Sequence, residues 1–156
     1  MRRMLIAATL ALVPFAARAD GVFPPAADAT VKKECGACHL AYSPQLLPSR
    51  SWETLMGDLA NHFGEDASLD AATAKHIRDY LVAHAAETSW RGSKMMRGVD
   101  LQNPPLRISE LPRFRTKHGW WEKRRMAFGQ SVKSWADCVG CHRGAERGVF
   151  EEEDDD

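Results

Sequence analysis

The sequence contains few aromatic residues, no net excess of charge of either sign, and no long hydrophobic run beyond its first 19 residues. Phe, Trp and Tyr make up 8% of the 156 residues, and no alternation of apolar residues predicts a convincing set of strands. With 21 basic and 21 acidic residues, the total charge gives no indication about nucleic acid. The length excludes a barrel of alternating strands and helices, and a dinucleotide-binding domain joined to a substrate domain. A hydrophobic content of 44% nonetheless predicts a globular protein.

The first 19 residues have the features of a signal for export. Arg2 and Arg3 precede an apolar stretch that is too short for a comfortable membrane span, and residues 17–19 (ARA) fit the small-x-small cleavage pattern. An uncleaved N-terminal anchor is the alternative. Cleavage would leave a mature chain that begins at Asp20 and has no membrane span. We therefore expect a soluble periplasmic protein.

The four cysteines occur in two copies of one motif, C-x-x-C-H. This motif is the signature of covalent c-type haem attachment. Its two thiols reach the two vinyl groups of one porphyrin, and the adjacent histidine gives an imidazole nitrogen to the iron. The sequence therefore predicts two covalently attached haem c groups. The predicted attachment residues are Cys35, Cys38, Cys138 and Cys141, and the predicted proximal ligands are His39 and His142.

Three other uses of C-x-x-C pairs compete with haem attachment. A dithiol redox centre usually occurs once, near a strand–helix–strand pattern that this chain lacks. A structural zinc site usually takes its ligand pairs from positions closer in sequence than 35 and 138. Two disulfides could form in an oxidising compartment. Two copies of the motif behind an export signal, each with its adjacent histidine, favour two haems.

Hydrophobic spacing predicts a mainly helical chain. Asp28 is a good N-cap for a first helix that runs into the first haem motif. A second helix is predicted from Ser51, with one apolar face and a stop at Gly64. A third is predicted over residues 70–86. Residues 88–112 are punctuated by glycine and proline, so we expect an irregular connection between the two haem regions.

Four histidines remain as candidates for the distal position on each iron. His62 lies at the edge of the apolar face of the second predicted helix, and His84 lies on the apolar face of the third, so the two compete for the first haem. His76 is turned away from that face. The helical pattern says nothing about His118. Methionines could instead give His/Met ligation, and the candidates are Met56, Met95, Met96 and Met126.

Charge is distributed unevenly along the mature chain. Residues 20–90 carry a net charge of −5, and residues 91–147 carry +8. Residues 151–156 are six consecutive acids, which repel one another and should be disordered. Because the basic block contains the second haem motif, we expect it to steer an acidic partner to that haem.

Motifs over nearly the whole mature chain resemble the periplasmic dihaem cytochrome c family of proteobacteria. The similar segments are Cys35–His39, LLPSRSW (46–52), NHFGEDASLD (61–70), IRDYL (77–81), RISELPRFRTKH (107–118) and CVGCHRGAERGVFEE (138–152). The resemblance implies a class I cytochrome c-like N-terminal domain with one haem and a less regular C-terminal region with the other. It also implies bis-histidine irons, with His62 and His118 as the distal ligands.

These observations together predict how the chain is organised. The expected parts are a signal peptide (1–19), an N-terminal cytochrome c domain with haem 1 (20–88), a linker (89–112), a C-terminal haem-binding region with haem 2 (113–150) and an acidic disordered tail (151–156).

Two six-coordinate irons leave no position for a substrate, so we expect an electron carrier and not an enzyme. A haem enzyme, or a small-molecule sensor with one open or labile iron position, is the alternative. The resemblance implies two redox partners, a small haem protein such as an oxygen-binding c-type cytochrome and a membrane cytochrome. We expect no nucleic-acid partner, and a monomer.

Overall fold

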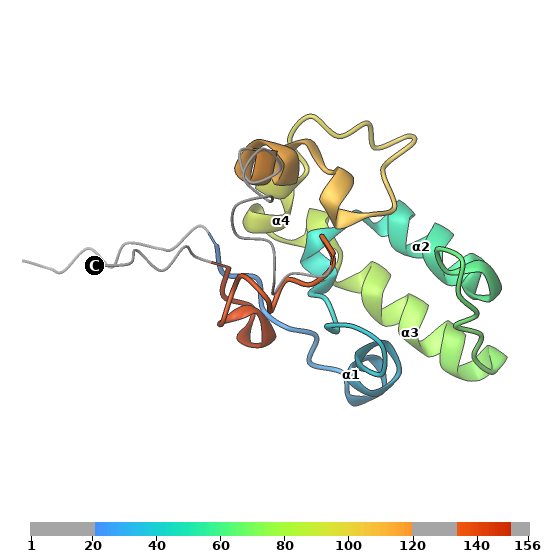
Figure 1. Ribbon diagram of the computed structural model, residues 1–156. Helices are drawn as coiled ribbons and strands as arrows, with labels where there is room; N and C mark the ends of the chain where they lie inside the picture. Colours follow the sequence, from blue (N-terminus) through green and yellow to red (C-terminus); the bar gives the residue numbers. More distant parts are fainter. Residues whose placement is uncertain (1–20, 120–133, 151–156) are drawn as a thin grey trace, which may run out of the picture.

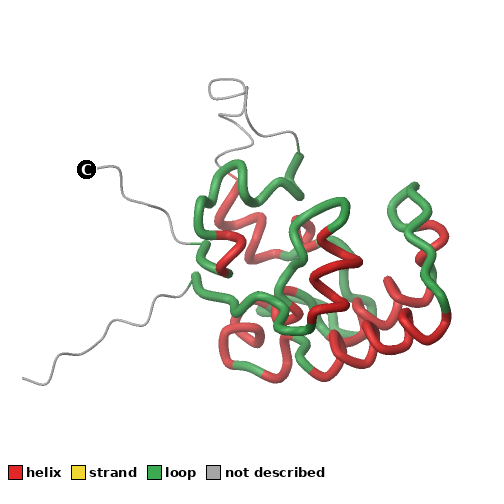
Figure 2. The backbone as a smooth tube through the Cα atoms, turned by 90° about the horizontal axis from the view of Figure 1, so that it is seen from below, coloured by secondary structure: helices red, strands yellow, loops and turns green. Residues whose placement is uncertain are grey.

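The computed structural model describes residues 21–119 and 134–150, and within these ranges the chain is mainly helical (Figure 1). Short helices and loops alternate in the tube view, and the described part contains no strand (Figure 2). The predicted mainly α fold is therefore confirmed. No helix in the described ranges is long and apolar enough to cross a membrane. The predicted signal peptide and acidic tail lie outside the described residues.

Four α-helices and five 3-10 helices have defined bounds in the described ranges, and residues 112–119 are also helical. In chain order the bounded elements are α1 (Ala29–Gly36), η1 (Pro44–Leu46), α2 (Ser49–Gly57), η2 (Leu59–Asn61), α3 (Ala71–Ala83), η3 (Ala86–Thr88), α4 (Trp90–Met95), η4 (Ile108–Glu110) and η5 (Ala145–Arg147).

Helices α2 and α3 lie side by side and carry the centre of the core (Figure 1). Ile77 and Leu81 of α3 are buried there together with Trp52 of α2. The Trp52 indole donates a hydrogen bond of 2.9 Å to the carbonyl of Pro44, so the ring also fastens the proline-containing loop that precedes α2. This loop connects the first haem motif to the core.

Carboxylate caps begin α1 and α3 where the sequence predicts them. Asp28 accepts a hydrogen bond from the amide of Val31, and Asp70 accepts from the amides of Ala72 and Thr73. Each cap satisfies amides that have no partner inside the first turn of a helix. Both predicted N-termini are thereby confirmed.

The second helix is shorter than predicted. It begins at Ser49, directly after Pro48, and ends at Gly57 instead of continuing to Gly64. Asp58 leaves the helical conformation, with φ −140° and ψ 59°. Glycine and aspartate are both weak helix formers, and this pair stops the helix although the apolar spacing continues past it.

As a result, His62 lies in a turn and not on a helix face. The backbone amide of His62 donates to the carbonyl of Glu65 at 2.8 Å, and the amide of Glu65 donates back at 3.2 Å. Phe63 and Gly64 turn the chain with φ of 57° and 100°. Gly64 therefore acts as a turn residue, as a glycine at positive φ can.

The segment expected to be irregular contains helix α4. The Ser89 side chain caps it by accepting from the amide of Gly92 at 3.0 Å. Met95 and Met96 at its end are buried in the core, each 8% exposed, so the expectation of an irregular connection is wrong here. Residues 97–107 beyond α4 contain no helix, as expected.

The beginning and the end of the described chain lie side by side (Figure 1). An antiparallel bridge joins Val22 to Val149, and the amide of Phe23 donates to the carbonyl of Gly148 at 2.7 Å. Gly148 has a φ of 75°, and a Cβ atom there would lie 1.8 Å from the carbonyl oxygen of Phe23. The join between the two ends therefore requires a glycine.

We expect Gly148→Ala to lower the free energy of unfolding by about 2 kcal/mol, because the added methyl forces the ends apart. Thermal unfolding of the haem-loaded protein followed by circular dichroism would measure this. Gly57→Ala is the matched control, since a Cβ at Gly57 meets nothing within 4 Å. Equal melting temperatures for the two variants would show that the join contributes little stability.

Candidate haem sites

The first haem motif straddles the end of α1. Cys35 lies in the last turn of this helix and is half-buried, whereas Cys38 and His39 follow it and are exposed. The Nδ1 atom of His39 lies 2.7 Å from the carbonyl oxygen of Leu40, to which it donates in one tautomer. In that tautomer Nε2 keeps its lone pair and is available to a metal.

His62 faces His39. The two ring centres are 6.3 Å apart and the ring planes differ by 20°. Two imidazoles on opposite sides of one metal ion, each bonded at about 2 Å, have ring centres about 6 Å apart. Burial lowers the pKa of His62, and His39 and Arg107 lower it further, so the imidazole stays neutral as a ligand must.

The second haem motif is a tight turn. The amides of Cys141 and His142 both donate to the carbonyl of Cys138, at 3.3 and 2.8 Å. The Asp137 carboxylate accepts from the amide of Gly140 at 3.1 Å and fixes the loop between the two cysteines. The turn therefore keeps Cys138, Cys141 and His142 together in one compact loop.

His118 faces His142, with 6.0 Å between ring centres and 82° between ring planes. His118 comes from the helical residues 112–119, and its Nδ1 lies 2.9 Å from the carbonyl oxygen of Phe114. The separation again fits one metal ion between two imidazoles. The two pairs are built from four separate parts of the chain.

Aromatic side chains flank both pairs. Tyr42 stacks on His39 with ring centres 5.0 Å apart, and Phe114 stacks on His118 at 3.9 Å. Trp135 meets His118 edge-on at 6.1 Å. The Tyr42 hydroxyl also donates to the carbonyl of Ala136 at 2.7 Å, which ties the first site to the segment before Cys138. Burial raises the pKa of Tyr42 to about 12, so this hydroxyl remains a donor.

No sequence motif marks Tyr42 or Trp135 as part of a haem site. Tyr42 lies three positions after His39, and Trp135 lies three positions before Cys138. An aromatic residue at the same distance on either side of a haem motif is a signal that could have identified them.

The other histidines lie elsewhere. The Nδ1 atom of His84 is 2.8 Å from the carbonyl oxygen of Tyr80, and its ring stacks on the Tyr80 ring at 4.3 Å. His76 is about half exposed and lies 2.9 Å from the Asp28 carboxylate. Its predicted outward position is confirmed. His84 is exposed, although the sequence places it on an apolar face.

The four cysteines form no disulfide with one another. Burial raises the pKa of Cys35, and burial together with Asp137 raises the pKa of Cys138 to about 11. Both groups are therefore uncharged at neutral pH. Within the described ranges no three His, Cys, Asp or Glu side chains gather closely enough to hold a metal ion.

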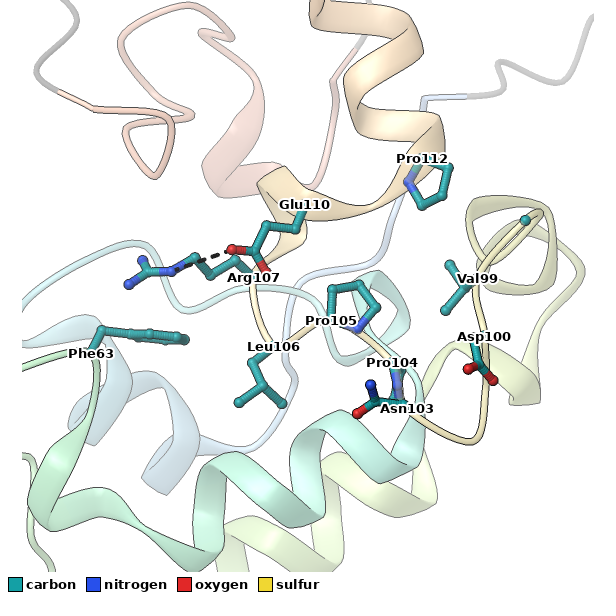
Figure 3. Close-up of a pocket in the computed structure, with 11 residues that line it drawn as sticks. Phe63, Val99, Asp100, Asn103, Pro104, Pro105, Leu106, Arg107, Glu110 and Pro112 are labelled. Atoms are coloured by element: carbon teal, nitrogen blue, oxygen red, sulfur yellow. Dashed lines mark ion pairs between the residues drawn. The ribbon is translucent and has the colours of Figure 1, made fainter.

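A groove of about 500 Å³ lies beside the first pair, between Phe63 and the proline-rich segment (Figure 3). Within it, the Arg107 guanidinium carbon is 3.9 Å from the centre of the Phe63 ring, and Nε is 3.9 Å from an oxygen of Glu110. No histidine lines this groove. Its contribution to the site is the cation that Arg107 places next to His62.

The profile of one protein family, dihaem cytochrome c, matches residues 31–150. The chain belongs to this dihaem cytochrome c family. No curated protein matches it. Cytochromes of the family are generally electron carriers, and the match implies that this one, too, binds two haem c groups covalently.

Solved structures of similar cytochromes agree with the fold. A diheme cytochrome c from Rhodobacter sphaeroides is 50% identical, with a TM-score of 0.74, and the match covers 81% of this chain and 99% of that chain. A second structure, of DHC purified from Rhodobacter sphaeroides, is 46% identical with a TM-score of 0.61 and the same coverage. A diheme cytochrome type c from Shewanella baltica OS155 is 35% identical over 79% of this chain and 86% of that chain, with a TM-score of 0.63.

We expect that replacing both Cys138 and Cys141 by alanine removes one haem, because no thiol remains to bond its vinyl groups. The intact mass should fall by one haem beyond the change in the side chains, and the remaining haem should survive acid-acetone extraction. The pair Cys35→Ala and Cys38→Ala is the reciprocal control. Two haem masses retained in either double variant would contradict the assigned attachment sites.

Proposed function

We propose that this cytochrome is a monomeric periplasmic electron carrier whose two irons each have two histidine ligands. The ligand pairs are His39 with His62 and His142 with His118. The observation that carries the proposal is that each motif histidine faces a second imidazole across about the width of one coordinated metal ion.

The facing histidine pairs support one-electron transfer at these sites. Each bound haem supplies the redox change, and two protein ligands on an iron leave no position for a substrate. The carbonyls of Leu40 and Phe114 orient His39 and His118 through their Nδ1 atoms. Because no ligand is lost or gained, little rearrangement accompanies each electron.

One observation favours a second function, a sensor of small molecules at the first site. His62 is held by a turn and not by a helix, and its Nδ1 is buried without a hydrogen-bond partner among the described residues. Of the two distal ligands it is the less firmly oriented, so an incoming ligand such as carbon monoxide would displace it more easily.

We expect His62→Ala and His118→Ala each to convert about half of the haem to the high-spin form, because each opens one of two irons. The reduced wild-type protein should show no spectral change with carbon monoxide, whereas each variant should bind it at one site. Absorption spectra with and without carbon monoxide measure both effects.

His84→Ala is the control, since His84 also stacks on an aromatic ring but faces no motif histidine. It should leave both haems low-spin. An open iron in His84→Ala, or none in His62→Ala, would contradict the first ligand pair. Carbon monoxide binding to half the haem of the wild type would favour the sensor.

We further propose that a small acidic haem protein docks on the basic side of the second site, and that a membrane cytochrome is the other redox partner. Exposed cations near His118 and His142 support the first part. In the described ranges they are Arg115, Lys117, Arg143 and Arg147. Further basic residues, Lys123, Arg124 and Arg125, lie outside the described residues.

The rate of electron transfer to such a partner should fall about tenfold or more as the Debye length shrinks from about 30 Å to about 10 Å. Stopped-flow mixing across a salt series measures this. The double variant Arg115→Glu and Lys117→Glu should flatten the dependence, since it reverses two charges beside the second site. The double variant Lys32→Glu and Lys33→Glu on α1 is the matched control and should leave the salt dependence of the rate unchanged. Indifference to salt would assign the basic block a purely structural role.

A further inference from the structure

The two facing pairs differ in the angle between their rings. His39 and His62 are nearly parallel, at 20°, whereas His118 and His142 are nearly perpendicular, at 82°. The centre of the Phe114 ring lies 3.9 Å from that of His118, the two ring planes differ by 11°, and the Phe114 carbonyl accepts a hydrogen bond from His118 Nδ1 in one tautomer. Trp135 contacts both Phe114 and His118 in an edge-on arrangement. These contacts hold His118 across His142.

The angle matters for the electronic state of an iron held between the rings. An iron between two imidazoles has a pair of d orbitals with π symmetry toward the ligands. Two parallel imidazoles both interact with the same member of this pair, so the two orbitals would differ in energy. Two perpendicular imidazoles interact with one member each, so the two orbitals would stay nearly equal in energy. Ferric low-spin iron lacks one electron in this set and gains from the separation. Ferrous iron fills the set and gains nothing. The perpendicular pair therefore favours the ferrous state relative to the parallel pair.

Charge acts in the same direction. Among the described residues of 113–147, five are basic and two are acidic, whereas residues 28–70 around the first pair contain three basic and seven acidic ones. Reduction removes one positive charge from a haem, so a positive surrounding favours it. Arg107 beside His62 and Asp137 beside Cys138 oppose the trend, one at each site. With Arg107 and Asp137 counted, the described residues near the second pair still have an excess of cations, and those near the first pair still have an excess of acids.

We propose that the pair His118 and His142 is the higher-potential site, where the reducing electron resides, and that Phe114 is the positioning residue that sets its perpendicular geometry. The proposal rests on the bis-histidine ligation proposed above. Reduction by one electron at either site changes no bond to a protein ligand. An electron that enters at the first site then moves on to the site surrounded by cations.

Electron paramagnetic resonance of the frozen, oxidised, full-length holoprotein tests this directly. We expect two low-spin signals, a rhombic one from the parallel pair and a highly anisotropic one from the perpendicular pair. Stepwise reduction with dithionite in the presence of mediators should remove the anisotropic signal first. At any one ambient potential, the ratio of reduced to oxidised iron should be roughly threefold higher or more for the anisotropic signal than for the rhombic one. One nearby charge at a protein surface produces an effect of this size.

Phe114→Leu should shift the anisotropic signal toward the rhombic form and narrow the difference in potential. Tyr80→Leu is the matched control, because it removes a ring stacked on His84, a histidine outside both pairs, and it should change neither signal. If Phe114→Leu does not fold, the double variant Arg115→Glu and Lys117→Glu tests the effect of nearby cations on the potential alone. It should lower the potential of the anisotropic signal only and leave its shape unchanged.

The outcomes separate this inference from the proposed function. A high-spin signal in the oxidised wild type would overturn the bis-histidine ligation itself. Two outcomes would overturn the assignment of the higher potential while leaving bis-histidine ligation intact. The first is two rhombic signals in the oxidised protein. The second is an anisotropic signal that disappears during reduction at the same time as the rhombic signal, or later. An anisotropic signal unchanged in a folded Phe114→Leu variant would overturn the role of Phe114.

Discussion

A second imidazole lies 6.3 Å from His39 and 6.0 Å from His142, between ring centres, and contacts between distant segments hold these separations. The partners come from different parts of the chain: His39 follows α1, His62 lies in the turn after α2, and His118 lies in the helical residues 112–119. No single element contains both members of a pair. The packing of α2 on α3, and the turn between them, therefore decide whether a second imidazole lies opposite His39.

The small size of the chain explains why the sites and the core are continuous. A region of about 60 residues buries little apolar surface alone, and a porphyrin adds a large apolar body to it. Tyr42 and Phe114 pack against the ligand rings and partly against the core. Segments far apart in sequence are also joined, by the Tyr42 hydroxyl to Ala136 and by the bridge between Val22 and Val149. The N-terminal and C-terminal haem regions therefore share contacts in the structure.

The two histidine pairs have similar separations between ring centres but differ in surroundings. The first pair has nearly parallel rings, and its distal member, His62, is held by backbone hydrogen bonds of a turn. The second has nearly perpendicular rings, clamped by Phe114 and Trp135 in a basic part of the chain. Under the proposed bis-histidine ligation the two irons would differ in properties although their ligands are the same, because ring orientation and local charge both act on the oxidation state.

The sequence by itself determined the chemistry of attachment and the helical class. The spacing within C-x-x-C-H is local, and the carboxylate caps at Asp28 and Asp70 act within one turn, so no distant contact alters them. Helix ends were less predictable: α2 stops at Gly57 although the apolar spacing continues, and α4 forms in a segment with loop composition because Ser89 caps it and Met95 packs into the core. Only the tertiary structure decided which histidines face each other, and at what angle. His62 and His84 have similar positions in the apolar pattern, and the turn after α2 alone brings His62 opposite His39, because ligand pairing depends on contacts between distant segments that helical periodicity does not record.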